Sequence, residues 1–331
     1  MQDPPRKKLT PVVLIFMVVV VIFVVATGFF KRVFKKEVDV KEDLTVSNYY
    51  STLLTKDGLS SDWKPGEKFG TDNEPEISGE SGLVVELNFG QIVYEKNSTK
   101  RMKIASLAKI MTFVVALEHN LPAQTGKVED EILISQKAAT IGEDFMGISE
   151  GETYSLEELL YGLVLNSGND AAYAIAEGVA GDSGTFVKWM NMKAKELDLT
   201  DTSFADPSGL DNDSYSTAVD LVKLARYAMQ KEEFRKIVGT VSIELPYSEK
   251  HKYLYLVNQT NLLTTYPGVA GIKTGYTEEA GYCLVSYAKN EGKELIGVVL
   301  NSVNRKFDMI WMLDYGYATL GVTIEHPLLI F

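Results

Sequence analysis

The sequence predicts an α+β domain whose single antiparallel sheet is built from strands at both ends of the folded region. Alternating apolar residues typical of strands occur early, at residues 83–94, and return late, at residues 268–301. Between them, residues 132–239 show mostly helical periodicity, and a last helix is expected at residues 306–320. Strands that flank a helical insertion in this way favour one sheet flanked by helices, with the inserted helices forming a subdomain.

The individual elements follow from local patterns. Residues 83–94 predict a hairpin that turns near residues 88–90, and an apolar stretch without glycine or proline predicts a helix at residues 104–119. A capping box formed by Ser155 and Glu158 marks the start of the next helix. The inserted helices are expected at residues 155–165, 170–180, 184–197 and 217–230. The late strands are expected at residues 268–276, 282–289 and 294–301.

The N-terminal part predicts a membrane anchor followed by a spacer. Residues 9–30 carry no charge and would extend about 33 Å as a helix, enough to cross a bilayer. We therefore expect a cytoplasmic tail at residues 1–8, one transmembrane helix at 9–30, a polar linker at 31–80 and the domain at 81–331. A cleaved signal peptide is the alternative, although the apolar run is longer than a usual signal core.

Ser106 and Lys109 are the candidate nucleophile and base. Residues three apart share a helix face, so the hydroxyl and the amine are expected to meet. A serine hydroxyl needs an adjacent base, and a lysine can serve if burial and nearby positive charge lower its pKa. The same spacing recurs twice, but Pro65 disrupts one copy and a predicted strand separates the side chains of the other.

Two later motifs add further candidates. Ser167 and Asn169 follow the helix predicted at residues 155–165, where they could alternatively cap the next helix. Lys273, Thr274 and Gly275 fall in a predicted strand, where the alternative is an exposed lysine beside a glycine bulge. In an active site, the small Gly275 would let a substrate backbone lie against the strand edge.

The ordered set of Ser-x-x-Lys, Ser-x-Asn and Lys-Thr-Gly is the motif set of penicillin-binding proteins and class A β-lactamases. With flanking stretches at residues 206–211, 261–268 and 313–317, the chain resembles the D-alanyl-D-alanine carboxypeptidase family of low-molecular-mass penicillin-binding proteins. The resemblance runs from about Ser81 to about Leu320. It implies a five-stranded antiparallel sheet flanked by helices, a helical subdomain, and an active site where the two meet.

The resemblance also implies a reaction. Ser106 would attack the carbonyl between the two terminal D-alanines of a peptidoglycan stem peptide, and Lys109 would take the hydroxyl proton. Ser167 would relay a proton toward the leaving amine, and Asn169 would orient Lys109 and the substrate amide. Lys273 would supply positive charge that keeps the amine of Lys109 neutral.

Four further residues are implied to bind the substrate. Thr274 would hold the terminal carboxylate, and Gly275 would leave room for the peptide beside the strand. The backbone N–H groups of Ser106 and Tyr276 would form the oxyanion hole. Arg305 would lie near the carboxylate, although a surface charge at a helix cap is the alternative for this residue.

Other functions remain open or are disfavoured. A D,D-endopeptidase or a β-lactamase-like hydrolase would use the same site, and a non-catalytic cell-wall-binding module is the alternative from another class. The net charge of −12 argues against nucleic-acid binding. The three histidines are scattered without metal-ligand spacing, so no metal or cofactor is expected. The expected partners are stem peptides ending in D-Ala-D-Ala, β-lactam inhibitors and the cell membrane, with the domain on its extracytoplasmic side.

Overall fold

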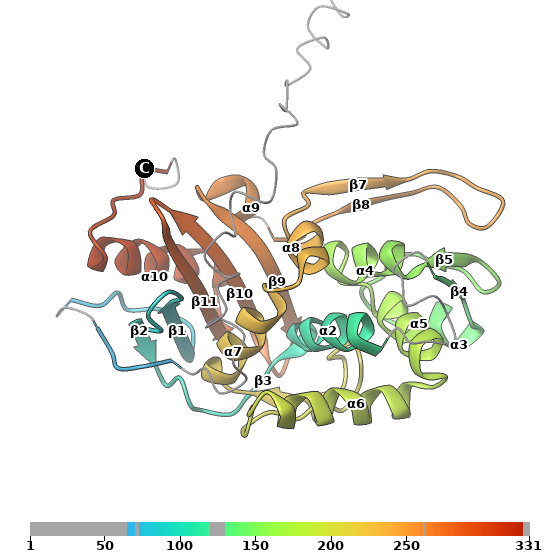
Figure 1. Cartoon of the computed structure of the whole chain (residues 1–331), viewed down its shortest axis with the longest axis horizontal. Helices are drawn as coiled ribbons and strands as arrows, with labels where there is room; N and C mark the ends of the chain where they lie inside the picture. Colours follow the sequence, from blue (N-terminus) through green and yellow to red (C-terminus); the bar gives the residue numbers. More distant parts are fainter. Residues whose placement is uncertain (1–64, 70–72, 120–129, 261, 327–331) are drawn as a thin grey trace, which may run out of the picture. The chain divides into compact units, whose positions relative to one another are not determined.

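The computed structural model describes residues 65–69, 73–119, 130–260 and 262–326, and its main sheet has five antiparallel strands (Figure 1). The order across the sheet is β2-β1-β11-β10-β9. The strands are β1 (Ser81–Glu86), β2 (Ile92–Lys96), β9 (Val269–Thr277), β10 (Gly281–Asn290) and β11 (Lys293–Ser302). Because β1 pairs with β11 along its whole length, strands from both ends of the chain build one sheet. The predicted antiparallel architecture is therefore confirmed.

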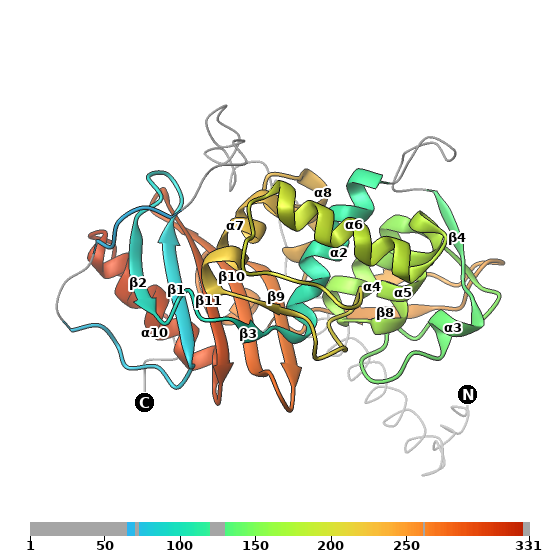
Figure 2. The ribbon, with the colours of Figure 1, turned by 90° about the horizontal axis from the view of Figure 1, so that it is seen from below.

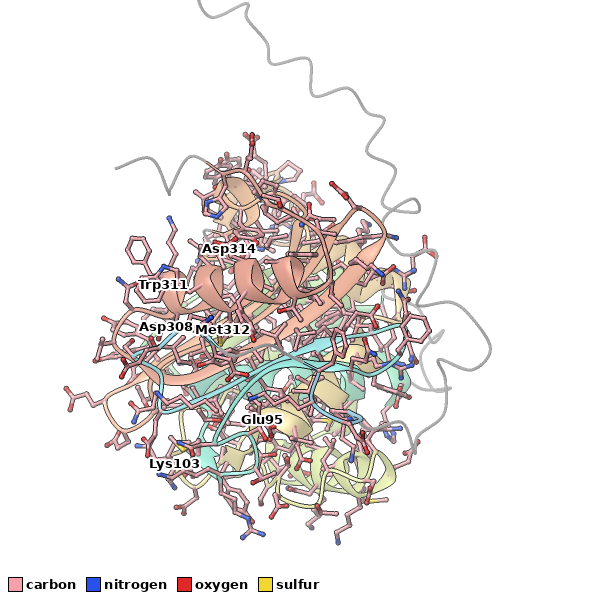
Figure 3. The ribbon with its side chains drawn as sticks, turned by 90° about the vertical axis from the view of Figure 1, so that its left-hand side faces the viewer. Glu95, Lys103, Asp308, Trp311, Met312 and Asp314 are labelled. Atoms are coloured by element: carbon pink, nitrogen blue, oxygen red, sulfur yellow. The ribbon has the colours of Figure 1, made fainter. Side chains whose placement is uncertain are left out.

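Helix α10 (Arg305–Thr319) covers one face of this sheet. Successive side chains of a strand point to opposite faces, so Leu295 and Val299 of β11 pack in the cluster that includes Met312 of α10. Figure 3 shows α10 lying across the sheet, with Trp311 on its outer side. The sheet thus buries this face mainly against α10, with the short α9 (Leu262–Thr265) packing beside it on β9.

The opposite face of the sheet meets α7 (Ala218–Ala228) and the helical part of the domain. Ile296 and Val298 of β11 belong to the core cluster shared with these helices. The remaining helices are α2 (Lys109–His119), α3 (Gln136–Ala139), α4 (Leu156–Leu165), α5 (Asn169–Ala180), α6 (Ser183–Glu196), α8 (Glu232–Val238) and α9 (Leu262–Thr265). Figure 2 shows that the sheet and this helical subdomain lie side by side.

Helix α2 is the centre of the helical subdomain. It contacts α4, α5, α6 and α7, and its residues 109–116 are all buried. A helix that is apolar on all sides is stable only when other elements surround it. Its first residue therefore lies at the junction between the sheet and the helices.

Three short two-stranded sheets complete the fold. They are β3 (Met102–Lys103) with β6 (Tyr215–Ser216), β4 (Glu131–Leu133) with β5 (Thr153–Ser155), and β7 (Ser242–Leu245) with β8 (Leu254–Val257). These strands are too short to be predicted from the pattern of apolar residues. The β7–β8 hairpin lies along the helical subdomain, and β8 contacts α4 (Figure 1).

Part of the predicted spacer packs on the domain. Phe69 donates its backbone N–H to Ile92 at 2.6 Å, and the hydroxyl of Ser78 donates to Asp308 of α10 at 2.7 Å. The side chain of Ile77 is buried in the sheet–α10 core. The folded domain therefore begins before Ser81, the boundary drawn from the sequence.

The predicted tail at residues 1–8, the predicted transmembrane helix at 9–30 and the first part of the predicted linker lie outside the described residues. Within the described ranges, no helix is long and apolar enough to span a bilayer.

Candidate active site

Ser106 lies in a 3₁₀ turn, Ala105–Ala108, that leads directly into α2. Such a turn has about three residues per turn, so residues three apart lie over one another. The Nζ atom of Lys109 lies 2.8 Å from the Oγ atom of Ser106. The hydroxyl and the amine that the sequence places on one face are in contact.

Two glycines allow the backbone to approach this turn closely. A Cβ atom on Gly209 would lie 1.9 Å from the carbonyl oxygen of Ala105, and Gly209 itself has a φ of +80°. A Cβ atom on Gly275 of β9 would lie 3.2 Å from the backbone nitrogen of Ser106. Loop 206–211 and strand β9 therefore enclose the Ser106 turn from two sides. A larger residue does not fit at position 209, and at position 275 it would be tightly crowded.

Loop 206–211 is held by the carboxylate of Asp206. This carboxylate accepts hydrogen bonds from the backbone N–H groups of Gly209 at 2.5 Å and Asp211 at 3.0 Å. The folded loop presents the carbonyl oxygen of Ser208 to the amine of Lys109 at 2.8 Å. Residues 206–211, which in the sequence indicate only the family resemblance, thus hold the candidate base Lys109 in place.

The amine of Lys109 is buried and surrounded by three oxygen atoms. Besides Ser106 and Ser208, it lies 2.8 Å from the Oδ1 atom of Asn169 at the start of α5. Burial lowers the pKa of Lys109 to about 7, against the opposing effect of four carboxylates. These belong to Asp144, Asp206, Asp170 and Glu143. A base whose pKa lies near neutrality can accept the hydroxyl proton of Ser106 at physiological pH.

Lys273 lies on β9 and is also buried. Its Nζ atom donates to the carbonyl oxygen of Thr274 at 3.0 Å. Burial, followed by the charge of Lys109, holds the pKa of Lys273 well below its usual value. The family resemblance implied that a charge on Lys273 keeps the amine of Lys109 neutral. In the structure, burial is the largest cause for both amines.

Ser167 and Asn169 occupy the turn between α4 and α5. Ser167 has a φ of +60°, in the left-handed region. Gly168 is the N-cap of α5 and no side chain caps this helix, so neither Ser167 nor Asn169 serves as its cap. The amide of Asn169 instead joins Lys109 to the carbonyl oxygen of Gly142, to which its Nδ2 atom donates at 3.0 Å.

Arg305 is the first residue of α10, and Asn304 caps the helix. The guanidinium group of Arg305 donates to the carbonyl oxygen of Gly275 at 2.8 Å. It also lies over the ring of Tyr282, 5.3 Å from the ring centre. The structure therefore places Arg305 beside the Lys-Thr-Gly strand and not in a surface cap.

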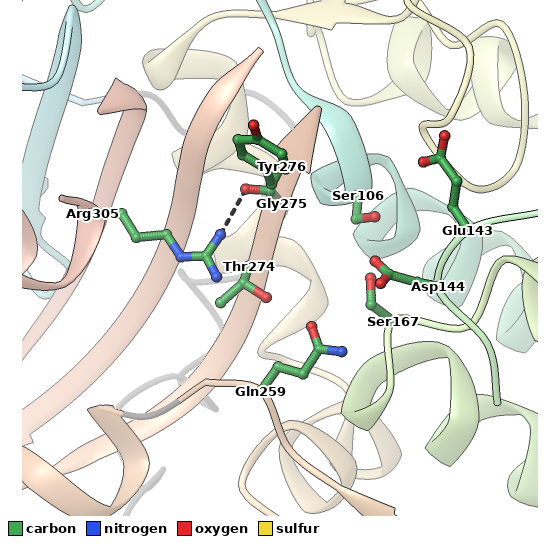
Figure 4. A pocket seen from close by; sticks show the side chains of 9 residues that line it. All are labelled: Ser106, Glu143, Asp144, Ser167, Gln259, Thr274, Gly275, Tyr276 and Arg305. Atoms are coloured by element: carbon green, nitrogen blue, oxygen red, sulfur yellow. Dashed lines mark hydrogen bonds between the residues drawn. The ribbon is translucent and has the colours of Figure 1, made fainter. Parts of the chain in front are cut away.

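These elements enclose a pocket of about 200 Å³ (Figure 4). Its walls come from the Ser106 turn, strand β9, the Ser167 turn, the loop between α3 and β5, the segment after β8 and the start of α10. The lining residues are Ser106, Glu143, Asp144, Ser167, Gln259, Thr274, Gly275, Tyr276 and Arg305. The predicted Lys109, Asn169 and Lys273 are buried behind this surface.

Three of the lining residues were not predicted. Glu143 and Asp144 lie in an irregular loop, and Gln259 lies between β8 and α9. No motif or periodicity marks them in the sequence. Backbone contacts bring them to the site, since Asn169 donates its N–H to the carbonyl oxygen of Asp144 at 2.8 Å and Gln259 donates to Leu165 at 3.2 Å.

Comparison with known proteins gives the same assignment as the motifs. Residues 68–304 match the family described as D-alanyl-D-alanine carboxypeptidase. A D-alanyl-D-alanine carboxypeptidase of Bacillus subtilis, DacF, is 38% identical over 252 residues, which cover 75% of this chain and 64% of the relative. A D-alanyl-D-alanine carboxypeptidase of a Streptomyces strain is 32% identical over 259 residues, covering 74% of this chain and 89% of the relative.

The fold is likewise similar to a solved structure. The crystal structure of the Streptomyces K15 DD-transpeptidase aligns with a TM-score of 0.70 at 31% identity, over 74% of this chain and 99% of that protein. The penicillin-binding-protein-like fold predicted from the sequence is thereby confirmed.

Proposed function

Because the chain belongs to the D-alanyl-D-alanine carboxypeptidase family of serine peptidases, we propose that it removes the terminal D-alanine from peptidoglycan stem peptides. One observation carries this proposal. The buried amine of Lys109 contacts the hydroxyl of Ser106, which lines the pocket. This pair supplies a nucleophile and a base with a suitable pKa in one place.

The first step forms an ester. The oxygen of Ser106 attacks the carbonyl carbon between the two D-alanines while its proton moves to the neutral amine of Lys109. The tetrahedral intermediate then collapses, and the bond to the terminal D-alanine breaks. Ser167 lines the pocket, and its hydroxyl can donate a proton to the leaving amine while it takes one from the ammonium group of Lys109, which returns Lys109 to its neutral form. The products are free D-alanine and a peptidyl ester on Ser106.

Two backbone N–H groups can stabilise the oxyanion. In a trans peptide unit the C=O and N–H bonds point in opposite directions. Since the carbonyl of Gly275 points to Arg305, the N–H of Tyr276 points away from Arg305, toward the free edge of β9. The Ser106 turn lies against this strand. The N–H groups of Ser106 and Tyr276 are therefore the proposed donors, each contributing about 3 kcal/mol to the transition state.

The other side of the pocket suits a terminal carboxylate. The hydroxyl of Thr274 and the guanidinium of Arg305 both line the pocket beside Gly275. A fixed guanidinium and a hydroxyl donor favour a peptide that ends at this point. Water then hydrolyses the ester, with Lys109 accepting one proton of the water and the oxygen of Ser106 recovering a proton.

Penicillin and a stem pentapeptide test this function. A penicillin should acylate wild-type protein and not the Ser106→Ala variant, and the same substitution should lower D-alanine release about 10⁴-fold or more. A cross-linked peptide dimer, assayed in parallel, measures endopeptidase activity. Failure to release D-alanine from the pentapeptide, while the dimer is cleaved, would refute the carboxypeptidase assignment.

We also propose that residues 9–30 anchor the chain in the cell membrane, with the domain on the extracytoplasmic side. The uncharged length of this segment and the location of peptidoglycan support the proposal. Protease added to intact cells or spheroplasts should digest the domain. In a separate fractionation without protease, the full-length chain should sediment with the membranes. Recovery of the full-length chain in the soluble fraction would contradict the anchor.

A further inference from the structure

The pocket carries opposite charges on its two sides. Glu143 and Asp144 lie on one side of Ser106, and Arg305 lies on the other side, beside Gly275 (Figure 4). Both carboxylate-bearing residues are exposed at the mouth of the pocket. A ligand that spans Ser106 therefore meets a cation at one end and two carboxylates at the other. We call Glu143 and Asp144 the acidic rim.

Several groups of the pocket lack partners within the described part of the chain. Neither carboxylate of the acidic rim forms an ion pair with a described residue. Ser167 and Thr274 are buried residues whose hydroxyls open onto the pocket and form no hydrogen bond to any described residue. These two hydroxyls are therefore free to bond a polar ligand that enters the pocket.

The acidic rim is held in place by the start of α5, where Asn169 also contacts the amine of Lys109. The backbone N–H of Asn169 donates to the carbonyl of Asp144 at 2.8 Å, and its side chain donates to Gly142 at 3.0 Å. On the other side of the rim, Asp170 accepts the N–H groups of Met146 and Gly147, each at 2.8 Å. These bonds fix the backbone that carries the two carboxylates, so only their side chains need to become ordered when a ligand binds.

We propose that Glu143 and Asp144 bind an ammonium group of the substrate on the acyl side of the scissile bond. The inference rests on the proposed function, in which Arg305 and Thr274 hold the terminal carboxylate on the leaving side. A substrate ammonium group on the opposite side of Ser106 from that carboxylate belongs to the acyl part of the peptide, which becomes the ester. The preferred substrate is a stem peptide whose residue before the D-Ala-D-Ala pair has a free side-chain amine.

This preference has a chemical consequence. Acylation of the side-chain amine, as occurs when that amine is joined to another peptide, removes its positive charge. The acidic rim therefore distinguishes a stem with a free amine from one in which the amine is already an amide. Electrostatic selection of this kind is reduced by salt.

Two synthetic pentapeptides that differ only in acetylation of the lysine side chain at the third position test the proposal. The measurement is the ratio of kcat/KM for the free-amine peptide to that for the acetylated peptide. Wild-type protein should show a ratio of about two to five, typical of solvent-exposed ion pairs, and high salt should lower it. The ratio is used because Asp144 also acts on Lys109, an effect common to both peptides.

The variants Glu143→Gln and Asp144→Asn, singly and together, should lower this ratio, and the double variant should bring it to about one. Glu150→Gln is the matched control, since Glu150 is an exposed acid of the same loop that does not line the pocket. A wild-type ratio of one, or an unchanged ratio in the double variant, would overturn the acidic-rim proposal alone. Release of D-alanine from neither peptide by the wild type would overturn the underlying function instead.

Discussion

The guanidinium group of Arg305 donates a hydrogen bond to the carbonyl oxygen of Gly275, with 2.8 Å between the two atoms. This contact joins the first turn of α10 to the edge strand β9. It places a cation beside the pocket and orients the peptide unit that supplies the N–H of Tyr276. One side chain from the C-terminal helix thus serves two parts of the proposed reaction.

Replacement of Arg305 should weaken binding of the terminal carboxylate. We expect Arg305→Gln to raise KM for a stem pentapeptide about tenfold, as for loss of a charge-assisted hydrogen bond. Lys306→Gln, the adjacent residue, is the control because Lys306 does not line the pocket. Steady-state kinetics should also be measured with a peptide ending in a carboxamide. An equal loss for both peptides would show that Arg305 does not bind the carboxylate.

The pKa of Lys109 predicts an acidic limb in the pH profile. Only the neutral amine can accept a proton, so kcat/KM should rise as the pH passes through about 7. The carboxylate of Asp144 stabilises the ammonium form and so raises this pKa. Asp144→Asn should therefore shift the limb to lower pH, while Glu150→Gln leaves it in place. A shift to higher pH would contradict this electrostatic account.

Gly209 predicts a large difference between two glycine substitutions. Gly209→Ala places a methyl group against the carbonyl oxygen of Ala105, whereas Gly181→Ala meets no atom within 4 Å, although both glycines have a φ near +80°. We expect Gly181→Ala to lower the free energy of unfolding by about 1 kcal/mol, and Gly209→Ala by about 3 kcal/mol or more. Thermal unfolding measures the difference. Similar melting temperatures would mean that the Ser106 turn tolerates displacement.

Asp170 predicts a link between stability and the acidic rim. Its buried carboxylate accepts N–H groups from Met146, Gly147 and Ile148. Asp170→Asn replaces one acceptor oxygen by an amide donor and should cost about 2 kcal/mol of stability. It should also lower the preference for the free-amine peptide. The exposed Asp213→Asn is the control, and an Asp170 variant as stable as this control would contradict the role assigned to the carboxylate.

The contact between Ser106 and Lys109 could be predicted because it is local. Residues three apart in a helical turn meet whatever the rest of the chain does. Element positions were also predictable where periodicity and caps agree. The capping box of Ser155 and Glu158, for example, is present at the start of α4. The helical and strand patterns later in the chain gave ranges within a few residues of the observed elements.

The rest of the pocket could not be predicted because tertiary contacts create it. The β7–β8 hairpin has short strands, and Gln259, which follows it, reaches the pocket through a backbone bond to α4. Glu143 and Asp144 belong to a loop whose position depends on Asn169 and Asp170. The lowered pKa of Lys109 likewise follows from burial, a property that residue spacing does not report.

The pairing of β1 with β11 has a consequence for biosynthesis. Ser106 and Lys109 are translated before the strand that carries Lys273 and the helix that begins at Arg305. A chain that ends before Lys273 therefore contains the nucleophile and its base but lacks Lys273 and Arg305, so it should not react. The time course of acylation by penicillin during refolding should consequently follow the pairing of the later strands with β1.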